Sequence, residues 1–516
     1  MKDERKMCKP TLIFTNCNII TLEDENYIKN GHIKIFQDKI CEVSSLPYEG
    51  NKSDIVIDLH GATILPGFID SHNHLASTGR IQSYVNLGNT KNIEDAIELI
   101  RERVKNTEKG KWIYGWNWDE SKWAEKRYLT KDDLDAISTE HPIYLVRVCG
   151  HLVSVNSLAL EKLDLDMNHP GVIKKDGKPI GVLKDIVVGF EGVEHTDEDT
   201  MNGILVGCRI ANELGITTNT DNLRDYQIRP YIRLARERKL TVRMNINIPV
   251  EKFDCAKELG LTSGIGGEFL RISGVKIFTD GSIGAKTAAI SYDYIDDPNN
   301  HGIFTIEKKE LLRIYKEANA IGMQTATHAI GDRAIDLVLD CWEEVAKEQN
   351  IKPFMHRIEH AEIIRDDQLK RCKELGIVLS MQPNFMGEWG FPGEMYDQRL
   401  GHEITKKMNP FRKVINYGIK LCFGSDGMPL GPLYGIWSAV NCPYQDCKIS
   451  VLEALKAYTI WGAEVIGQQD KIGTIKKGKL ADLVILEENP LEVPEEHIKE
   501  IRILYTVVGG KIVYQR

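Results

Sequence analysis

Short apolar runs alternate with helical stretches over most of the chain, and this alternation restricts the possible folds more than any other feature. Stretches with helical periodicity, such as Lys308–Ala320 and Asp366–Leu375, separate consecutive runs. Strands that alternate with helices build parallel sheets, and eight such units close into a barrel. We therefore predict an α/β fold, a (β/α)8 TIM barrel. The runs are Thr63–Asp70, Gly215–Asp221, Thr241–Ile248, Leu270–Thr279, Met323–His328, Phe354–His360, Gly376–Gln382 and Ile419–Asp426.

Both ends of the chain have a different sequence pattern, with short β-type runs and frequent glycine. They include Thr11–Phe14 and His32–Phe36 at one end, and Ala481–Leu486 and Ile503–Val508 at the other. Gly509-Gly510 then precedes another β-branched run, which is a hairpin signal. Two β segments that bracket the barrel predict one composite β-sandwich domain formed by both termini. The expected domains are residues 1–62 and 466–516 for the sandwich and 63–465 for the barrel.

An insertion interrupts the predicted barrel at about residues 76–200, because this interval is too long for one connection between strand and helix. It contains a tryptophan-rich piece, Trp112–Trp123, and a glycine-rich, hairpin-like piece, Gly171–Val182. We expect the insertion to lie over the barrel mouth. Its tryptophans are expected to serve packing rather than to form a substrate box.

Charge and cysteine content exclude several classes of protein. The net charge is −9 and no long Lys/Arg run occurs, so a nucleic acid or an anionic membrane is a poor partner. No stretch approaches the roughly 18 apolar residues of a membrane helix. The first seven residues are charged and lack an apolar signal core. Eleven scattered cysteines fit reduced, buried thiols, so we expect a cytoplasmic protein.

The stretch Leu65–Leu75 contains the first chemical signal, His72-Asn73-His74. Residues two apart on a strand point to the same side, so the two imidazoles share one space. Two convergent imidazoles commonly begin a transition-metal site. A His-x-His pair alone is a weak signal, and the rest of the chain must supply further ligands.

Other strand ends supply them. Lys276 lies in the fourth run, His328 and His360 end the fifth and sixth, and Asp426 ends the eighth. Taken singly, each histidine also fits a hydrogen-bonded core residue, and Lys276 also fits an ion pair with an aspartate, Asp280 or Asp221. Carboxyl ends of barrel strands meet at one face, where active sites lie. Burying these groups unpaired would cost about 1–3 kcal/mol each, so together they favour a metal.

These motifs resemble those of the amidohydrolase superfamily, and within it amidohydrolase family 3, the YtcJ-like or N-substituted formamide deformylase-like proteins. The resemblance covers essentially the whole chain. The motifs that carry it are the first-strand stretch 65–74, Val275–Ser282, Thr327–Ala334, Arg357–His360, Gln382-Pro383, Gly424–Asp426 and Gly473–Leu483.

The resemblance implies a metal-dependent amidohydrolase with one or two divalent ions, zinc being expected first. It matches His72, His74, His328, His360 and Asp426 to the metal ligands. It places Lys276 where many superfamily members have a carboxylated lysine that bridges two metals. The resemblance also implies that the substrate is a small molecule with an amide, N-formyl, N-acyl or cyclic amide carbon–nitrogen bond. Size and family favour a homodimer.

In the implied mechanism, Asp426 accepts a proton from the metal-activated water and returns it to the leaving nitrogen. His151, Asp280 and Arg333 are the candidate substrate-binding residues. His151 lies in a glycine-histidine segment that resembles a substrate-reaching segment of the family, and it also fits a helix-start position. Arg333 also fits a packing salt bridge, and Asp280 also fits a structural role in its glycine-rich turn.

Three alternatives remain open. A deaminase of a small heterocycle shares the barrel and the first motif. Superfamily deaminases, however, usually place a glutamate as proton donor soon after the fifth-strand histidine, or in a His-x-x-Glu pattern. Here His328 is followed by Ala-Ile-Gly-Asp. A phosphotriester or lactone hydrolase uses similar metal geometry. A non-catalytic interaction protein on the same scaffold would be recognised by the lack of stoichiometric metal.

Overall fold

The computed structural model describes residues 11–23, 27–50, 54–147, 152–163, 165–184 and 196–516. The chain divides into two compact units, residues 1–76 with 208–516, and residues 77–207. The first unit contains two eight-stranded sheets and the second contains a six-stranded sheet. Among the described residues, no helix is long and apolar enough to cross a membrane.

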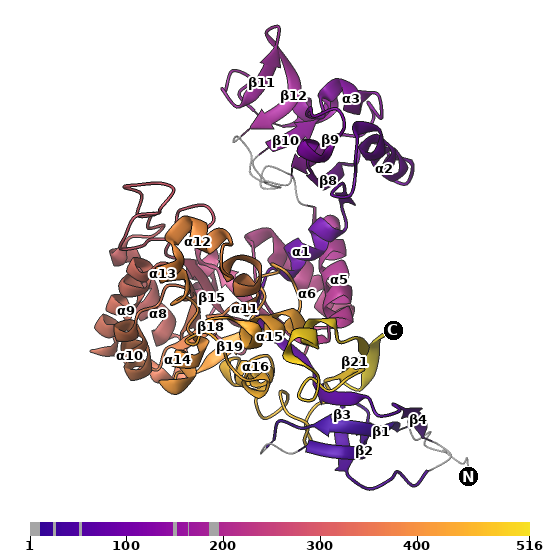
Figure 1. Cartoon of the computed structure of the whole chain (residues 1–516), viewed down its shortest axis with the longest axis vertical. Coiled ribbons are helices and arrows are strands. Elements are labelled where there is room, and N and C mark those ends of the chain that lie inside the picture. Colours follow the sequence, from indigo (N-terminus) through magenta and orange to yellow (C-terminus); the bar gives the residue numbers. More distant parts are fainter. Residues whose placement is uncertain (1–10, 24–26, 51–53, 148–151, 164, 185–195) are drawn as a thin grey trace. The chain divides into compact units, whose positions relative to one another are not determined.

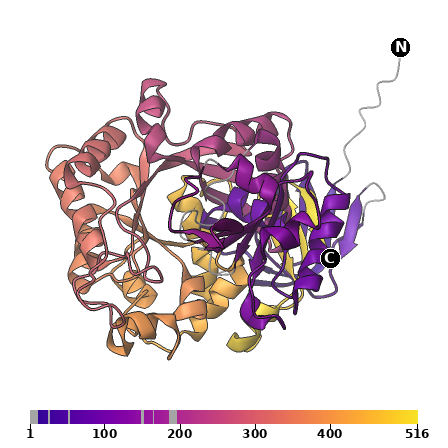
Figure 2. The ribbon, with the colours of Figure 1, turned by 90° about the horizontal axis from the view of Figure 1, so that it is seen from above.

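The parallel sheet of the first unit confirms the predicted barrel. Its strands follow chain order around the sheet, and the helices between them form a ring outside it (Figures 1 and 2). The expected helices at Lys308–Ala320 and Asp366–Leu375 are α8 and α10, with those bounds. The strands are β6 (Phe68–Asn73), β13 (Ile216–Asn222), β14 (Arg243–Pro249), β15 (Leu270–Phe278), β16 (Gln324–Ala329), β17 (Arg357–His360), β18 (Val378–Met381) and β19 (Leu421–Phe423).

Strand β19 meets β6 at the carboxyl end of the barrel. The Asp426 N–H donates to the His72 carbonyl over 2.8 Å. Gly424 permits this approach, because a Cβ at that position would lie 2.4 Å from the His72 nitrogen. The buried Asp70 carboxylate accepts hydrogen bonds from the N–H and the hydroxyl of Ser425, at 3.1 and 2.5 Å. The closure therefore brings the ends of the first and eighth strands together.

Strands from both ends of the chain share the second sheet, as the sequence predicted. The predicted first barrel run divides at Gly67, so that Thr63–Pro66 pairs with terminal strands and only Phe68–Asn73 enters the barrel. The sheet order is β22-β21-β20-β5-β1-β2-β3, with β4 beside β1. These strands are β1 (Leu12–Ile20), β2 (Tyr27–Phe36), β3 (Lys39–Ser44), β4 (Ile55–Asp58), β5 (Thr63–Pro66), β20 (Leu483–Leu486), β21 (Ile503–Val508) and β22 (Lys511–Gln515).

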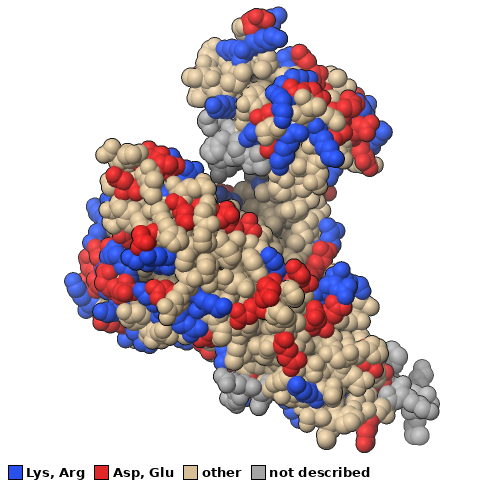
Figure 3. Space-filling view, in the orientation of Figure 1, with Lys and Arg blue, Asp and Glu red and all other residues tan. Residues whose placement is uncertain are grey.

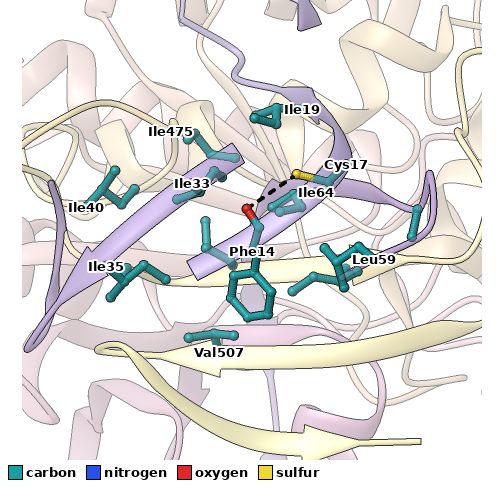
Figure 4. Close-up of a cluster of buried hydrophobic side chains, with 14 residues drawn as sticks. Phe14, Cys17, Ile19, Ile33, Ile35, Ile40, Leu59, Ile64, Ile475 and Val507 are labelled. Atoms are coloured by element: carbon teal, nitrogen blue, oxygen red, sulfur yellow. Dashed lines mark hydrogen bonds between the residues drawn. The ribbon is translucent and has the colours of Figure 1, made fainter. Parts of the chain in front are cut away.

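One apolar core holds the terminal strands together. Figure 4 shows Phe14 and Ile33 from the N-terminal strands packed in one cluster with Ile475 and Val507 from the C-terminal part. The predicted hairpin at Gly509-Gly510 is present, and both glycines have positive φ, at 54° and 72°, as the tight turn requires. Neither end could bury its apolar face alone, because each supplies only part of the sheet.

A buried ion pair links this sheet to the barrel. The Arg243 guanidinium, at the start of β14, donates to both carboxylate oxygens of Asp482 over 2.6 and 3.0 Å. Gly509 N–H donates to the same carboxylate over 2.8 Å. The bidentate geometry satisfies both charges in a buried place and aligns the C-terminal strands with the barrel. On the outside, Lys/Arg and Asp/Glu side chains are interspersed over the barrel unit on the face drawn in Figure 3.

The insertion forms the second unit. Its sheet has the order β11-β12-β10-β9-β8-β7, and the predicted hairpin is β11 (Val172–Lys175) with β12 (Lys178–Lys184). Trp118 and Trp123 are buried and their rings stack at 5.6 Å, so these two tryptophans do serve packing. The expected position over the barrel mouth stays a prediction. The other strands are β7 (Val85–Asn86), β8 (Ile113–Trp118), β9 (Ile143–Arg147) and β10 (Leu152–Val155).

Candidate metal centre

The predicted ligands lie at the carboxyl ends of the barrel strands. His72 is near the end of β6, Lys276 in β15, His328 in β16 and His360 at the end of β17. Ligand atoms of His72, His360 and Asp426 lie within 4.8 Å of one another. The His360 ring centroid lies 4.8 Å from that of His72 and 4.5 Å from that of His328. The first, fifth, sixth and eighth strands therefore converge on one cluster.

Four buried polar atoms of this cluster have no hydrogen-bond partner among the described residues. They are His72 Nε2, Lys276 Nζ, His360 Nδ1 and Asp426 Oδ1. A buried polar atom without a partner costs about 1–3 kcal/mol, and native proteins keep few of them. Their meeting at one place indicates a site for a group that the chain does not supply.

In His72 and His74, a hydrogen bond at Nδ1 orients the ring so that Nε2 faces Asp426. His72 Nδ1 lies 2.5 Å from Glu359 Oε2, and His74 Nδ1 lies 3.1 Å from the Asn222 carbonyl. Because both partners are acceptors, each Nδ1 carries a proton, and in the neutral rings each Nε2 presents a lone pair. These Nε2 atoms lie 3.5 and 3.2 Å from Asp426 Oδ1. Lone pairs facing a carboxylate at this distance fit a cation between them.

Electrostatics in the cluster favour metal-binding forms of the ligands. Burial lowers the pKa of His360 well below its usual value, so its ring is neutral. Burial alone would raise the pKa of Asp426, but positive charge on His72 and His74 beside it lowers that pKa well below its usual range, and a bound cation would act in the same direction. Metal ligands must be deprotonated, and both of these groups meet that condition.

Lys276 is buried beside the cluster. Its side chain is 2% exposed, and burial lowers the pKa of its ammonium to about 8 against the opposing charges of Glu359 and Asp426. The alternative ion pair with Asp221 or Asp280 is not present. Asp221 instead accepts from Leu75 N–H and Tyr231 OH. A desolvated lysine near neutral pH has an amine that can react with carbon dioxide.

Two ligand positions have backbone conformations that residues other than glycine rarely adopt. His360 has φ 73° and Asp426 has φ 55°, and Ala361 also has a positive φ, at 50°. Such conformations cost of order 1–3 kcal/mol each and persist where the surrounding structure requires them. Here they turn the chain at the ends of β17 and β19, where the ligands converge.

The other candidates have different surroundings. His328 Nε2 lies 2.9 Å from the Gly281 carbonyl, so Nε2 is the donor and Nδ1 keeps a lone pair. The Asp280 carboxylate accepts from the N–H groups of Ala289, Ile330 and Gly331 at 2.8–3.1 Å, which indicates that it holds the loops around His328. Its contact with substrate stays a prediction.

Arg333 and His151 are the remaining candidates. Arg333 is exposed, and its guanidinium lies 5.1 Å from the centre of the Phe304 ring. His151 lies outside the described residues. For both residues the predicted contact with substrate stays a prediction.

Sequence reasoning overlooked Glu359. Its side chain is fully buried and its carboxylate orients His72. Burial alone would raise the pKa of this carboxyl, but Arg357 and His72 lower it to about 2. The available signal was the alternation Arg357-Ile358-Glu359-His360, which puts three ionisable groups in one buried strand.

Glu359→Gln is expected to weaken metal binding about 10–100-fold, because a carboxylate that orients a ligating histidine also raises its basicity. Titration of the chelator-treated protein in metal buffers measures the affinity. Glu362→Gln is the matched control, since Glu362 is equally buried but bonds to Tyr396 OH at 2.6 Å rather than to a histidine. Equal affinities in wild type and Glu359→Gln would contradict the orienting role.

A (β/α)8 barrel with histidines and an aspartate gathered at the carboxyl ends of its strands defines the class of metal-dependent barrel hydrolases. A profile of the amidohydrolase family matches residues 55–514. The chain belongs to this family and is a hydrolase acting on carbon–nitrogen bonds.

Individual relatives agree with this assignment. The chain is 30% identical over 489 residues to the putative amidohydrolase YtcJ of Bacillus subtilis (strain 168), covering 89% of this chain and 90% of that protein. It is 26% identical over 501 residues to N-substituted formamide deformylase of Arthrobacter pascens, covering 89% and 90%. An uncharacterized metal-dependent hydrolase from Pyrococcus furiosus superposes with a TM-score of 0.79 at 28% identity, covering 93% of this chain and 100% of that one.

Proposed function

We propose that the protein hydrolyses the carbon–nitrogen bond of a small N-formyl, N-acyl or cyclic amide. The observation that carries this proposal is the set of four unpartnered buried atoms at the mouth of the barrel, with the Asp426 carboxylate among them. The relative named N-substituted formamide deformylase, similar along most of its length, supports the amide class.

The residues fit one or two divalent ions, with zinc expected first. His72, His74, His328 and His360 would hold them by ring nitrogens and Asp426 by its carboxylate, which are ligand types that zinc accepts. Lys276, carboxylated on Nζ, would add a bridging carbamate. When bound, such an ion supplies an acidified water and a polarised carbonyl.

The chain's own residues then handle the proton. In the proposed reaction, Asp426 accepts the proton of the attacking water and delivers it to the leaving nitrogen. Its low pKa keeps the carboxylate ionised before the reaction. Glu359 keeps the proton of His72 on Nδ1, so that Nε2 remains available on the cluster side.

A pocket beside the cluster is the proposed place for the organic part of the substrate. It has a volume of about 300 Å³ and lies against His74 and Lys276. Phe278 is 41% exposed there, next to the ring of His328 at 5.2 Å. The ends of β13 and β14 and the loops after them complete the wall with Asn222, Leu223, Arg224, Asp225, Tyr226, Pro249, Val250 and Glu251.

The deaminase alternative lacks a proton donor at the expected place. The carboxylate that follows His328 is Asp332, and it is engaged by Arg365 at 3.0 Å and by Ser291 N–H at 2.9 Å. We therefore prefer amide hydrolysis.

Metal analysis coupled to a substrate screen tests the proposed function. We expect stoichiometric metal in the purified protein and turnover of N-formyl, N-acyl or cyclic amide compounds, with turnover lost after chelation and restored by zinc. Release of free ammonia from an aryl or heteroaryl amine would favour the deaminase instead. Protein without stoichiometric metal would contradict the proposal.

A further inference from the structure

A second pocket lies at the opposite end of the barrel. It has a volume of about 350 Å³, in the range of small-molecule sites. Its wall includes Asn245, Arg271 and Gln324, which stand in the first three residues of β14, β15 and β16. The metal centre lies where these strands end. Arg271 and Lys276 are five residues apart on β15, which corresponds to about 16 Å along the strand.

Arg271 is the only charged side chain among the described residues that line this pocket. It forms no ion pair within the described part of the chain. Burial lowers the pKa of its guanidinium, and no acidic group raises it. Arg243, on the neighbouring strand, differs, because Asp482 raises its pKa and pairs with it. Arg271 is therefore a half-buried arginine that has no counter-ion among the described residues.

Two neutral side chains in the wall have a polar atom without a partner. Asn245 is 1% exposed, and its carbonyl accepts from Gln468 over 3.3 Å, which leaves its Nδ2 donor unpaired among the described residues. The Gln324 Nε2 lies within hydrogen-bond distance of three backbone carbonyls, and its Oε1 is unpaired within the described part of the chain. The amide donor of Asn245 has the same preference for an anion as Arg271.

Apart from the hydroxyl groups of Thr262, Ser263 and Ser273, the rest of the wall is apolar or glycine. The chain before β17 and the end of α17 (Ile460–Val465) contribute Phe354, Met355, Val465 and Ile466, and β15 contributes Ile272. A single cation in such a wall matches a ligand with one negative charge and an apolar body. An inorganic ion would leave the apolar wall without a partner.

We propose that this pocket binds a small organic monoanion, a carboxylate that pairs with Arg271 while its apolar body packs against Phe354 and Val465. The site is separate from the metal centre and takes no part in hydrolysis. Guanidinium and carboxylate form charge-assisted hydrogen bonds, which are the strong ones in a half-buried site.

Isothermal titration of the full-length, metal-loaded protein with benzoate, phenylacetate and hexanoate tests the proposal. At least one should bind, and its neutral amide (benzamide, phenylacetamide or hexanamide) should bind at least about tenfold more weakly. Arg271→Gln and Arg271→Met should weaken carboxylate binding by a similar factor. Arg236→Gln, at an exposed arginine of α6 (Ile228–Arg236), is the control and should bind as the wild type does.

Carboxylate binding at the metal centre would not depend on Arg271, so the Arg271 variants distinguish the two sites. Both Arg271 variants should keep the metal content and the kcat/KM of the wild type, and melting curves without ligand check their folding. Equal carboxylate binding in wild type and both variants would overturn the proposal. So would no binding of any of the three carboxylates, or inorganic phosphate binding as tightly as the best of them.

Discussion

Asp426→Asn is expected to reduce turnover by roughly 10²–10⁴-fold while the protein keeps nearly all of its metal. Asparagine preserves the size of the side chain and one oxygen, but it cannot take up the proton of the attacking water. The Asp426 carboxylate lies 3.2–3.5 Å from the Nε2 atoms of His72 and His74, so the substitution acts at the centre of the cluster. The kcat of the best amide substrate and the metal content of the same sample are the measurements.

Asp332→Asn is the matched control for this experiment. Asp332 also follows a barrel strand, but its carboxylate is bound to Arg365 and Ser291. We expect its kcat to stay within a few-fold of the wild-type value. Unchanged kcat in Asp426→Asn, or a larger loss of kcat in Asp332→Asn than in Asp426→Asn, would contradict the assignment of Asp426 as the proton carrier.

Lys276→Met is expected to lower both the bound metal and the turnover, the latter by roughly 10³-fold, because a ligand to the ion contributes several kcal/mol to catalysis. Methionine matches the length of the buried lysine and cannot form a carbamate. Native mass spectrometry of the wild type should show the added mass of one carbon dioxide, and the variant should lack it.

Lys347→Met, at an exposed lysine just after α9 (Asp332–Ala346), is the control and should change neither quantity. Full metal content and full turnover in Lys276→Met would show that this lysine is a structural residue only. Loss of metal without any carbon dioxide adduct in the wild type would assign Lys276 an electrostatic role in place of the carbamate.

The sequence predicted the barrel well because its strands are buried on both sides and its helices are periodic. Helices α8 and α10 have the predicted bounds, since each combines an apolar face with clear ends. The division of the run Thr63–Asp70 at Gly67 was not predictable from periodicity. Both halves are fully buried, and pairing with β1 and β20 assigns Thr63–Pro66 to the terminal sheet.

The sequence by itself determined the fold class and the residue types of the candidate site. The alternation of strands and helices indicates the barrel, and the residues at the end of each predicted strand can be read directly from the sequence. It could not determine which atoms face one another. The role of Glu359 depends on a contact with His72, 287 positions away in the chain, and the protonation of His74 depends on a carbonyl in β13. Barrel closure brings these groups together. The same holds for Arg271, because its lack of an acidic partner among the described residues is a property of the folded chain.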